Sequence, residues 1–269
     1  MGVTLRGSER GHRREIRHTD TIRIMTSEPL PPTTGADISL QDGLTVRPLH
    51  GPEELRSACR IYREIFGYTG EDQSLNPRLL QSLLNHGGSV IGAVGARGEI
   101  LAMAYGWTAV DQTPEDSHVY HFSQAAVVAA ELQGRGVGRA MKQAQAAVAR
   151  HNGAERMRWT YDPLLSRNGH FNLDVLGARG RWFQKDAHGV PGTDRITVEW
   201  RLSGERPPLA ASPVEELIIP TSKPAPGEQE NLVDALRTRF HELFDAGYSA
   251  VSCRRSGEDE AVYTFQKEK

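Results

Sequence analysis

The sequence contains little cysteine, no long apolar run and almost no net charge. Cys59 and Cys253 are its only cysteines and lie far apart, so we expect neither a disulfide framework nor a metal site, and reduced thiols in a cytoplasmic protein. No apolar stretch approaches the roughly 18 residues that a membrane helix needs, so no membrane partner is expected. The formal net charge of -2 gives no general reason to expect binding to nucleic acid.

Residues 1–42 differ in composition from the rest of the chain. The stretch carries six arginines and then three prolines, at Arg6, Arg10, Arg13, Arg14, Arg17, Arg23, Pro29, Pro31 and Pro32. Without an apolar core it does not match a secretory signal, and it is typical of a disordered tail. A basic arm for nucleic acid is the alternative. Met25 is a second candidate translation start, which would leave residues 1–24 outside the native protein.

Apolar periodicity predicts an α/β domain over residues 43–203. Strands are expected at 44–49, 89–96, 100–108, 118–128, 157–161, 181–184 and 195–202, and helices at 53–66, 77–84, 140–151 and 166–176. The segment 127–161 reads as a strand, a helix and a strand, which is the pattern of a parallel crossover. Together with the preceding hairpins, this crossover implies a mixed sheet.

The C-terminal part is expected to contain a linker and a small appendage. Residues 204–227 are rich in proline and serine, which favours an extended linker. Residues 228–269 contain an amphipathic helix over 231–246 and a hairpin over 248–266. This appendage is too small to fold alone, so it should pack on the preceding domain.

A glycine-rich turn joins the strand at 118–128 to the following helix. Glycines let a phosphate approach the backbone, and the helix start offers free N–H groups and positive charge, to which Arg135 or Arg139 can add. A phosphate loop ending in Gly-Lys-Ser/Thr and a G-x-G-x-x-G dinucleotide turn both fail to match the letters. The turn therefore predicts a pyrophosphate cradle, with an ordinary glycine-rich turn as the alternative.

Two motifs resemble the GNAT (Gcn-related N-acetyltransferase) superfamily. Gln133, Gly136 and Gly138 match its Q/R-x-x-G-x-G/A motif, and the run from Trp159 to Leu173 resembles a branch of predicted GNAT acyltransferases. The resemblance covers about residues 42–266. It implies a mixed, centrally splayed sheet flanked by helices, with a C-terminal helix plus hairpin.

The resemblance also implies a cosubstrate, acetyl-CoA or another acyl-CoA, and a set of residues that hold it. Asn168 and backbone groups near Ala126, Val127 and Val128 would lie along the pantetheine, and one N–H there would polarise the thioester. The pyrophosphate would lie on the turn and the helix start, formed by Gln133, Gly134, Arg135, Gly136, Val137, Gly138 and Arg139. A substrate amine would then attack the thioester directly.

The acid and base are less well marked. Many GNAT enzymes use a tyrosine as the acid for the leaving thiolate, but the matching place here is near Leu173 or Asp174, so Tyr161 is the substitute candidate. His121 and His170 are candidate bases, with ordinary structural histidines as the alternative. Arg237 and Arg239 could receive a substrate carboxylate, although a solvated helix face is the simpler interpretation of each.

The sequence thus predicts an acyl-CoA-dependent N-acyltransferase of acetyl or succinyl type, acting on a small amine such as an amino acid. A non-catalytic acyl-CoA sensor and a protein N-acetyltransferase are the alternatives. No sequence pattern identifies the acceptor, the acyl chain or the oligomeric state, and a homodimer is compatible with the sequence.

Overall fold

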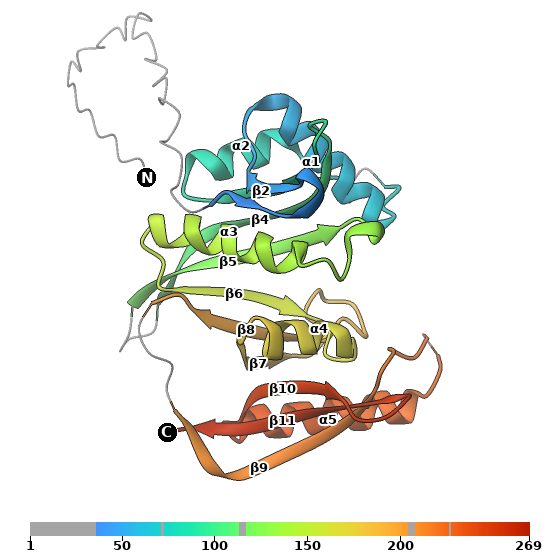
Figure 1. The fold of residues 1–269 in the computed structure, drawn as a ribbon. Coiled ribbons are helices and arrows are strands. Elements are labelled where there is room, and N and C mark those ends of the chain that lie inside the picture. The colour runs from blue at the N-terminus through green and yellow to red at the C-terminus, as the bar shows by residue number, and fades with distance from the viewer. Residues whose placement is uncertain (1–35, 71–72, 113–116, 204–207, 226) are drawn as a thin grey trace, which may run out of the picture. The chain divides into compact units, whose positions relative to one another are not determined.

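The computed structural model describes residues 36–70, 73–112, 117–203, 208–225 and 227–269 (Figure 1). These residues form one sheet of eleven strands in the order β1-β2-β3-β4-β5-β6-β8-β7-β10-β11-β9. The strands are β1 (Ile38–Ser39), β2 (Thr45–Pro48), β3 (Ser89–Val94), β4 (Ile100–Gln112), β5 (Ser117–Val128), β6 (Arg156–Tyr161), β7 (Arg179–Gln184), β8 (Arg195–Arg201), β9 (Leu209–Pro220), β10 (Ser249–Arg255) and β11 (Glu260–Glu268).

Five α-helices accompany the sheet in the described residues. They are α1 (Gly51–Phe66), α2 (Pro77–Asn85), α3 (Val137–His151), α4 (Ser166–His170) and α5 (Glu230–Asp245). The short turns η1 (Gln41–Gly43) and η2 (Ala130–Leu132) are 3-10 helices, whereas η3 (Phe171–Val175), which continues α4, is a π-helix. None of the described helices is both long and apolar enough to cross a membrane.

Helices cover both faces of the N-terminal half of the sheet. On β3, Ile91 and Ala93 belong to a core shared with α3, whereas Val90 and Val94 belong to a core shared with α1 and α2. Successive side chains of a strand point to opposite faces, so α3 lies on one face and α1 with α2 on the other. A strand buried on both faces explains why β3 is apolar or small throughout.

The predicted α/β class and the mixed sheet are confirmed. Strands β5 and β6 are parallel and are joined by α3, while the other neighbouring strands pair antiparallel. The predicted helix at 166–176 exists, but its second half is the π-helix η3 rather than an α-helix.

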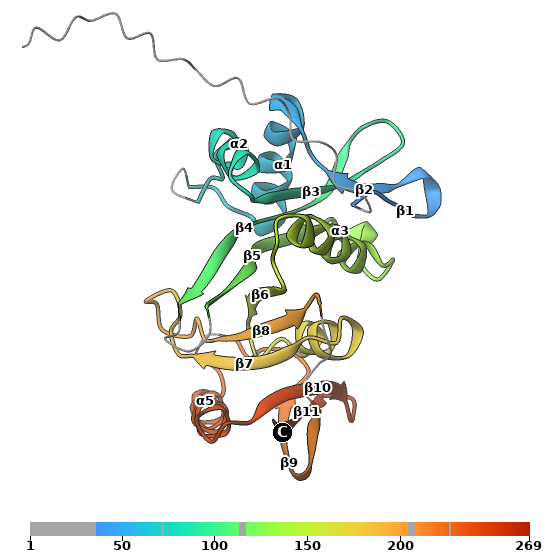
Figure 2. The same cartoon turned by 90° about the vertical axis from the view of Figure 1, so that its left-hand side faces the viewer.

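The C-terminal elements extend the same sheet. Strand β10 meets β7 at Ala250 and Gly180, and α5 packs beside β7 (Figure 2). Phe240 of α5 and Tyr263 and Phe265 of β11 are each at most 1% exposed and share one core with Met157, Trp159 and Tyr161 of β6. The appendage is therefore continuous with the core of the preceding domain.

Two predicted boundaries are wrong. The tail was expected to reach residue 42, yet Ile38–Ser39 pairs with β2 and Ala36 is fully buried; residues 1–35 lie outside the described part. The expected linker at 204–227 contains β9, which pairs with β11 along most of its length. Its prolines suggested a break, but β9 is an edge strand, where a missing N–H need not disrupt the sheet.

Candidate functional site

The two parallel strands in the middle of the sheet separate after a short stretch. Strands β5 and β6 pair only at Tyr120 with Arg156, His121 with Met157, and Phe122 with Arg158. Beyond this point β5 stays paired with β4, and β6 stays paired with β8. The facing backbone edges of residues 123–128 and 159–161 are therefore not paired with each other. We call this opening the fork.

A β-bulge marks the start of the fork. Tyr105 of β4 pairs with Ala125, but the next residue, Gly106, pairs with Ser123, so Gln124 is the extra residue of β5. A Cβ on Gly106 would overlap the Phe122 carbonyl oxygen and lie 2.7 Å from His121 Nε2, so only glycine fits opposite the bulge. Gln124 is exposed although it lies on a central strand, which shows that the sheet is open at this point.

All three β5 residues that were expected along the pantetheine lie on the stretch of β5 that borders the fork. Ala126 is exposed, Val128 is half-buried and Val127 is buried in the core beneath α1. Their backbone edge toward β6 is the one that the fork leaves unpaired. This position is compatible with an extended chain of amides pairing along β5.

The glycine turn places the start of α3 beside the end of β5. Gly136 is the N-cap with φ of 82°, and it forms no side-chain cap. The N–H groups of Val137, Gly138 and Arg139 therefore have no partner within the helix. A Cβ on Gly134 or Gly136 would meet no atom within 4 Å, whereas a Cβ on Gly138 would lie 3.5 Å from the Phe171 ring, so the turn is open at its two leading glycines. An anionic phosphate group fits such a helix start.

Side chains around this turn tie it to the neighbouring elements. Gln133 Nε2 donates to the Val128 carbonyl (3.3 Å), and its Oε1 accepts from Arg167 of α4 (3.0 Å). Arg135 forms an ion pair with Asp42, while Arg139 is exposed on the first turn. Asn168 is exposed on α4, next to Arg167 in sequence. The turn, the end of β5 and α4 thus surround one region.

A buried polar network lies under the fork on the α3 side. Lys142 Nζ donates to Ser123 Oγ (2.7 Å), which donates to Gln145 Oε1 (2.9 Å), and Gln145 Nε2 donates to Ser89 Oγ (3.2 Å). Ser89 Oγ then contacts His121 Nε2 (2.9 Å). Burial, with a smaller contribution from Lys142, lowers the pKa of His121 to about 4. This low pKa makes the neutral His121 imidazole a weak base, and its side chain is fully buried.

The other two acid and base candidates lie toward the C-terminal strands. Tyr161 is 5% exposed, accepts a hydrogen bond from Tyr263 (3.2 Å), and has a pKa raised by burial. His170 lies on α4, where Nδ1 donates to the Cys253 carbonyl (3.1 Å). Its side chain is 54% exposed. Of the three candidates, only His170 has an exposed side chain, and the acid and base roles stay predictions.

The place expected for an acid tyrosine holds Asp174. This carboxylate accepts hydrogen bonds from Cys253 N–H (2.9 Å), Ser252 Oγ (2.8 Å) and Arg254 Nε (2.8 Å). Burial opposes its ionisation, but the donors prevail and its pKa is lowered. An ionised carboxylate with these partners ties η3 to β10 and has no proton to donate.

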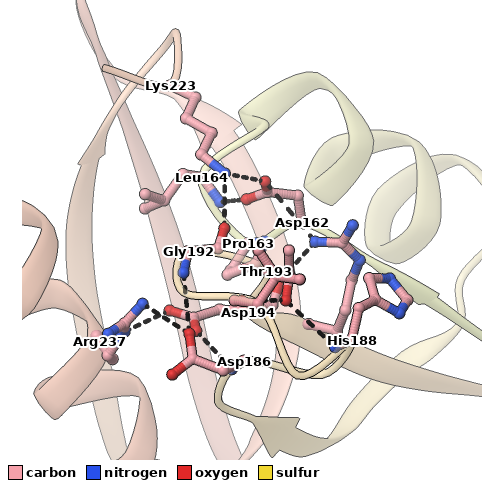
Figure 3. Close-up of polar contacts among 12 residues, drawn as sticks. Asp162, Pro163, Leu164, Asp186, His188, Gly192, Thr193, Asp194, Lys223 and Arg237 are labelled. Carbon is pink, nitrogen blue, oxygen red and sulfur yellow. Dashed lines mark hydrogen bonds and ion pairs between the residues drawn. The ribbon is translucent and has the colours of Figure 1, made fainter. Parts of the chain in front are cut away.

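Arg237 is not available for a substrate carboxylate, nor is it a freely solvated residue. Its guanidinium binds Asp194 (2.7 Å) and Asp186 (3.3 Å) in the loop between β7 and β8, as Figure 3 shows. In the same view Lys223 binds Asp162 (2.6 Å), and Asp162 caps the Leu164 N–H (3.0 Å). This cluster fastens the loop to α5 and to the strand end.

Comparison with known proteins gives remote structural similarities. No protein-family model and no curated protein matches the sequence. Solved structures that are similar include yncA of Salmonella typhimurium, a candidate acetyltransferase with its cofactor acetyl-CoA (16% identity, 61% of this chain, 96% of that chain, TM-score 0.49). A GCN5-related N-acetyltransferase from Kribbella flavida shows 21% identity over 59% of this chain and 98% of that chain, with a TM-score of 0.42.

A GNAT-family acetyltransferase from Streptococcus pneumoniae shows 14% identity over 59% of this chain and 99% of that chain, with a TM-score of 0.46. Two of these three structures are named as GCN5-related or GNAT-family proteins.

Three residues at the fork were not predicted from the sequence. Gln124 and Gly106 are visible only once the register of β4 and β5 is known. Lys142 did carry a signal, since a lysine stands on the apolar stripe of the helix between Met141 and Gln145 and is buried with them. A charged residue on a buried helix face is uncommon and is worth examining as a functional candidate.

Proposed function

We propose that this chain is an acyl-CoA-dependent N-acyltransferase that moves an acyl group to a small amine. The observation that carries the proposal is the combination of the fork with the open helix start at its end. A polar, extended cosubstrate with amides at one end and phosphates at the other matches an unpaired strand edge that leads to unpaired helix N–H groups.

The residues present fit such a cosubstrate. The edge of β5 at Ala126 to Val128 would pair with the pantetheine amides, and the bulge at Gln124 interrupts the pairing of β5 with β4 beside this edge. The N–H groups of Val137, Gly138 and Arg139 would hold the pyrophosphate, with Arg139 supplying charge. When bound, the acyl-CoA supplies an activated thioester.

The chain's contribution to the reaction is mainly orientation. A thioester held along β5 lies beside the exposed Gln124, where an amine can approach from solvent. A backbone N–H at the bulge would stabilise the negative charge on the carbonyl oxygen. The amine loses its proton to solvent or to a base such as His170, since His121 is buried and has a low pKa.

Calorimetry with a matched pair of variants tests this proposal. Gly136→Asp places a carboxylate at the N-cap, where it competes with phosphate for the same N–H groups. Gly153→Asp is the control, because Gly153 also has φ near 80° and open space but lies at the other end of α3. We expect native protein and Gly153→Asp to bind acetyl-CoA, succinyl-CoA and CoA, and Gly136→Asp to lose at least about tenfold in affinity.

Two results would contradict the proposal. One is that native protein fails to bind any of the three ligands at millimolar concentration. The other is that Gly136→Asp and Gly153→Asp bind equally well, which would place the ligand away from the start of α3. Thiol release on adding amino acids and other small amines then distinguishes an enzyme from a sensor that binds without turnover.

A further inference from the structure

Lys142 bridges the two strands at the point where they part. It lies one turn into α3, and only 5% of the residue is exposed. Its Nζ donates to Ser123 Oγ on β5 (2.7 Å) and lies 4.0 Å from the centre of the Trp159 ring on β6. Ser123 immediately precedes the bulged Gln124. The ammonium therefore sits directly behind the opening of the fork.

The charge of Lys142 is not balanced by its surroundings. Within the described ranges no ion pair joins Lys142 to a carboxylate, and its hydrogen-bonded network continues through the neutral Ser123, Gln145 and Ser89. The titratable group that faces it is His121 on β5, which carries no charge at neutral pH. Burial lowers the pKa of Lys142 to about 7.

An uncompensated cation in a protein interior is destabilising, so a purely structural role is better served by an apolar residue such as methionine. A buried cation at an opening in the sheet is useful where negative charge develops during a reaction. In acyl transfer such charge appears on the carbonyl oxygen and then on the leaving sulfur.

We propose that Lys142 is a positioning residue of the acyl-transfer site, which holds the bulge through Ser123 and keeps a positive charge behind the thioester. This inference rests on the proposed function. The amine nitrogen attacks the thioester carbon, the C–N bond forms and the carbonyl oxygen becomes negative. The C–S bond then breaks, the electron pair leaves with the CoA thiolate, and the amine gives up its proton to solvent or to a base such as His170. The Lys142 charge stabilises both anions.

The test compares Lys142→Met, Lys142→Arg and the control Lys185→Met, which removes an exposed lysine from the loop after β7. Lys142→Met should lower kcat for acetyl transfer by roughly ten- to hundredfold with little change in KM for acetyl-CoA. Lys142→Arg should recover part of this rate. It should also move the alkaline fall of kcat to higher pH, because arginine stays charged.

A second measurement does not require turnover. The thiol of bound CoA is titrated by its thiolate absorbance in native protein and in the variants. Native protein and Lys185→Met should lower the thiol pKa below that of free CoA, and Lys142→Met should remove most of that lowering.

The outcomes separate the two proposals. If native protein binds CoA and turns over, but Lys142→Met keeps both the rate and the bound-thiol pKa, the role of Lys142 is wrong and the acyltransferase proposal stands. If Lys142→Met loses rate through KM alone, the lysine is only part of the binding surface and the inference is wrong. If native protein does not bind CoA, both proposals fall.

Discussion

The residues at the fork act through geometry that is invisible in a linear sequence. Gly136 and its neighbours could be predicted because the phosphate-binding capacity of a helix start follows from local glycines. Gln124 could not, because a bulge depends on which residue of β4 lies opposite. In the sequence, His121 and Tyr161 are candidates for acid and base roles, which need an accessible side chain. Both are buried in the structure, and burial lowers the pKa of His121 and raises that of Tyr161.

The buried charge of Lys142 is expected to lower the stability of the protein while it serves the proposed reaction. Lys142→Met should raise the free energy of unfolding at pH 6 by about 1–4 kcal/mol, because the uncompensated charge is removed. Urea unfolding measures this. Equal stability of the variant and the native protein would mean that the ammonium is better compensated than its contacts show.

The pH dependence of stability gives an independent check on Lys142. The folded pKa of about 7 lies below the ordinary value of 10.5, so the unfolded chain binds more protons between these values. Stability should therefore rise with pH across this window, by up to about 1.4 kcal/mol per unit. Urea unfolding at several pH values should show this rise in native protein and not in Lys142→Met. A rise of the same size in both would assign it to other groups.

Among the elements, η3 is tied to β10 by the carboxylate of one residue, Asp174. Asp174 joins η3 to three donors on β10, so Asp174→Asn should lower the free energy of unfolding by about 1–3 kcal/mol at neutral pH. Asp245→Asn, at an exposed carboxylate on α5, is the matched control.

The pH effect at Asp174 has the same sign as that at Lys142, since both folded pKa values are lowered, but it falls in the acid range. Because its folded pKa is lowered, its contribution is present above the ordinary carboxyl value and is lost as pH falls through the folded pKa. Urea unfolding should therefore show a gap between native protein and Asp174→Asn that narrows in acid. A gap that stays constant with pH would mean that the substitution acts through the shape of the side chain rather than through its charge.

Elements with a clear period were predicted well, and those that depend on long-range pairing were not. The 3.6-residue period of α1, α3 and α5 gave their bounds within a few residues. Strand β9 was missed because its prolines suggested a linker. Its pairing with β11 is a long-range contact that no local sequence pattern indicates. The π-helical turn at η3 likewise has no local period that separates it from an α-helix.

For the whole described chain, the continuous core predicts that the C-terminal elements are not an independent domain. Phe240 of α5 contacts the rings of Phe183, Tyr263 and Phe265, and this cluster continues to β6. Phe240→Ala should cost about 3–5 kcal/mol. Because this shared core joins α5 and β11 to β6, we expect the protein to unfold in one cooperative transition. Near- and far-ultraviolet circular dichroism should then report the same midpoint.

The control for this prediction is Phe66→Ala, since Phe66 is 44% exposed on α1. It should change stability much less than Phe240→Ala does. The contradicting outcome is that Phe240→Ala unfolds in two separate transitions, with the transition of the N-terminal elements at the midpoint of native protein. That result would show that the α5–β11 region unfolds by itself.

The central claim is that acyl-CoA lies in the fork, and a crystal structure of the chain with acetyl-CoA tests it most directly. We predict the pantetheine between β5 and β6 along Ala126 to Val128, and the pyrophosphate on the N–H groups of Val137 to Arg139. Acetyl-CoA bound elsewhere, with the fork closed by strand pairing, would contradict the account.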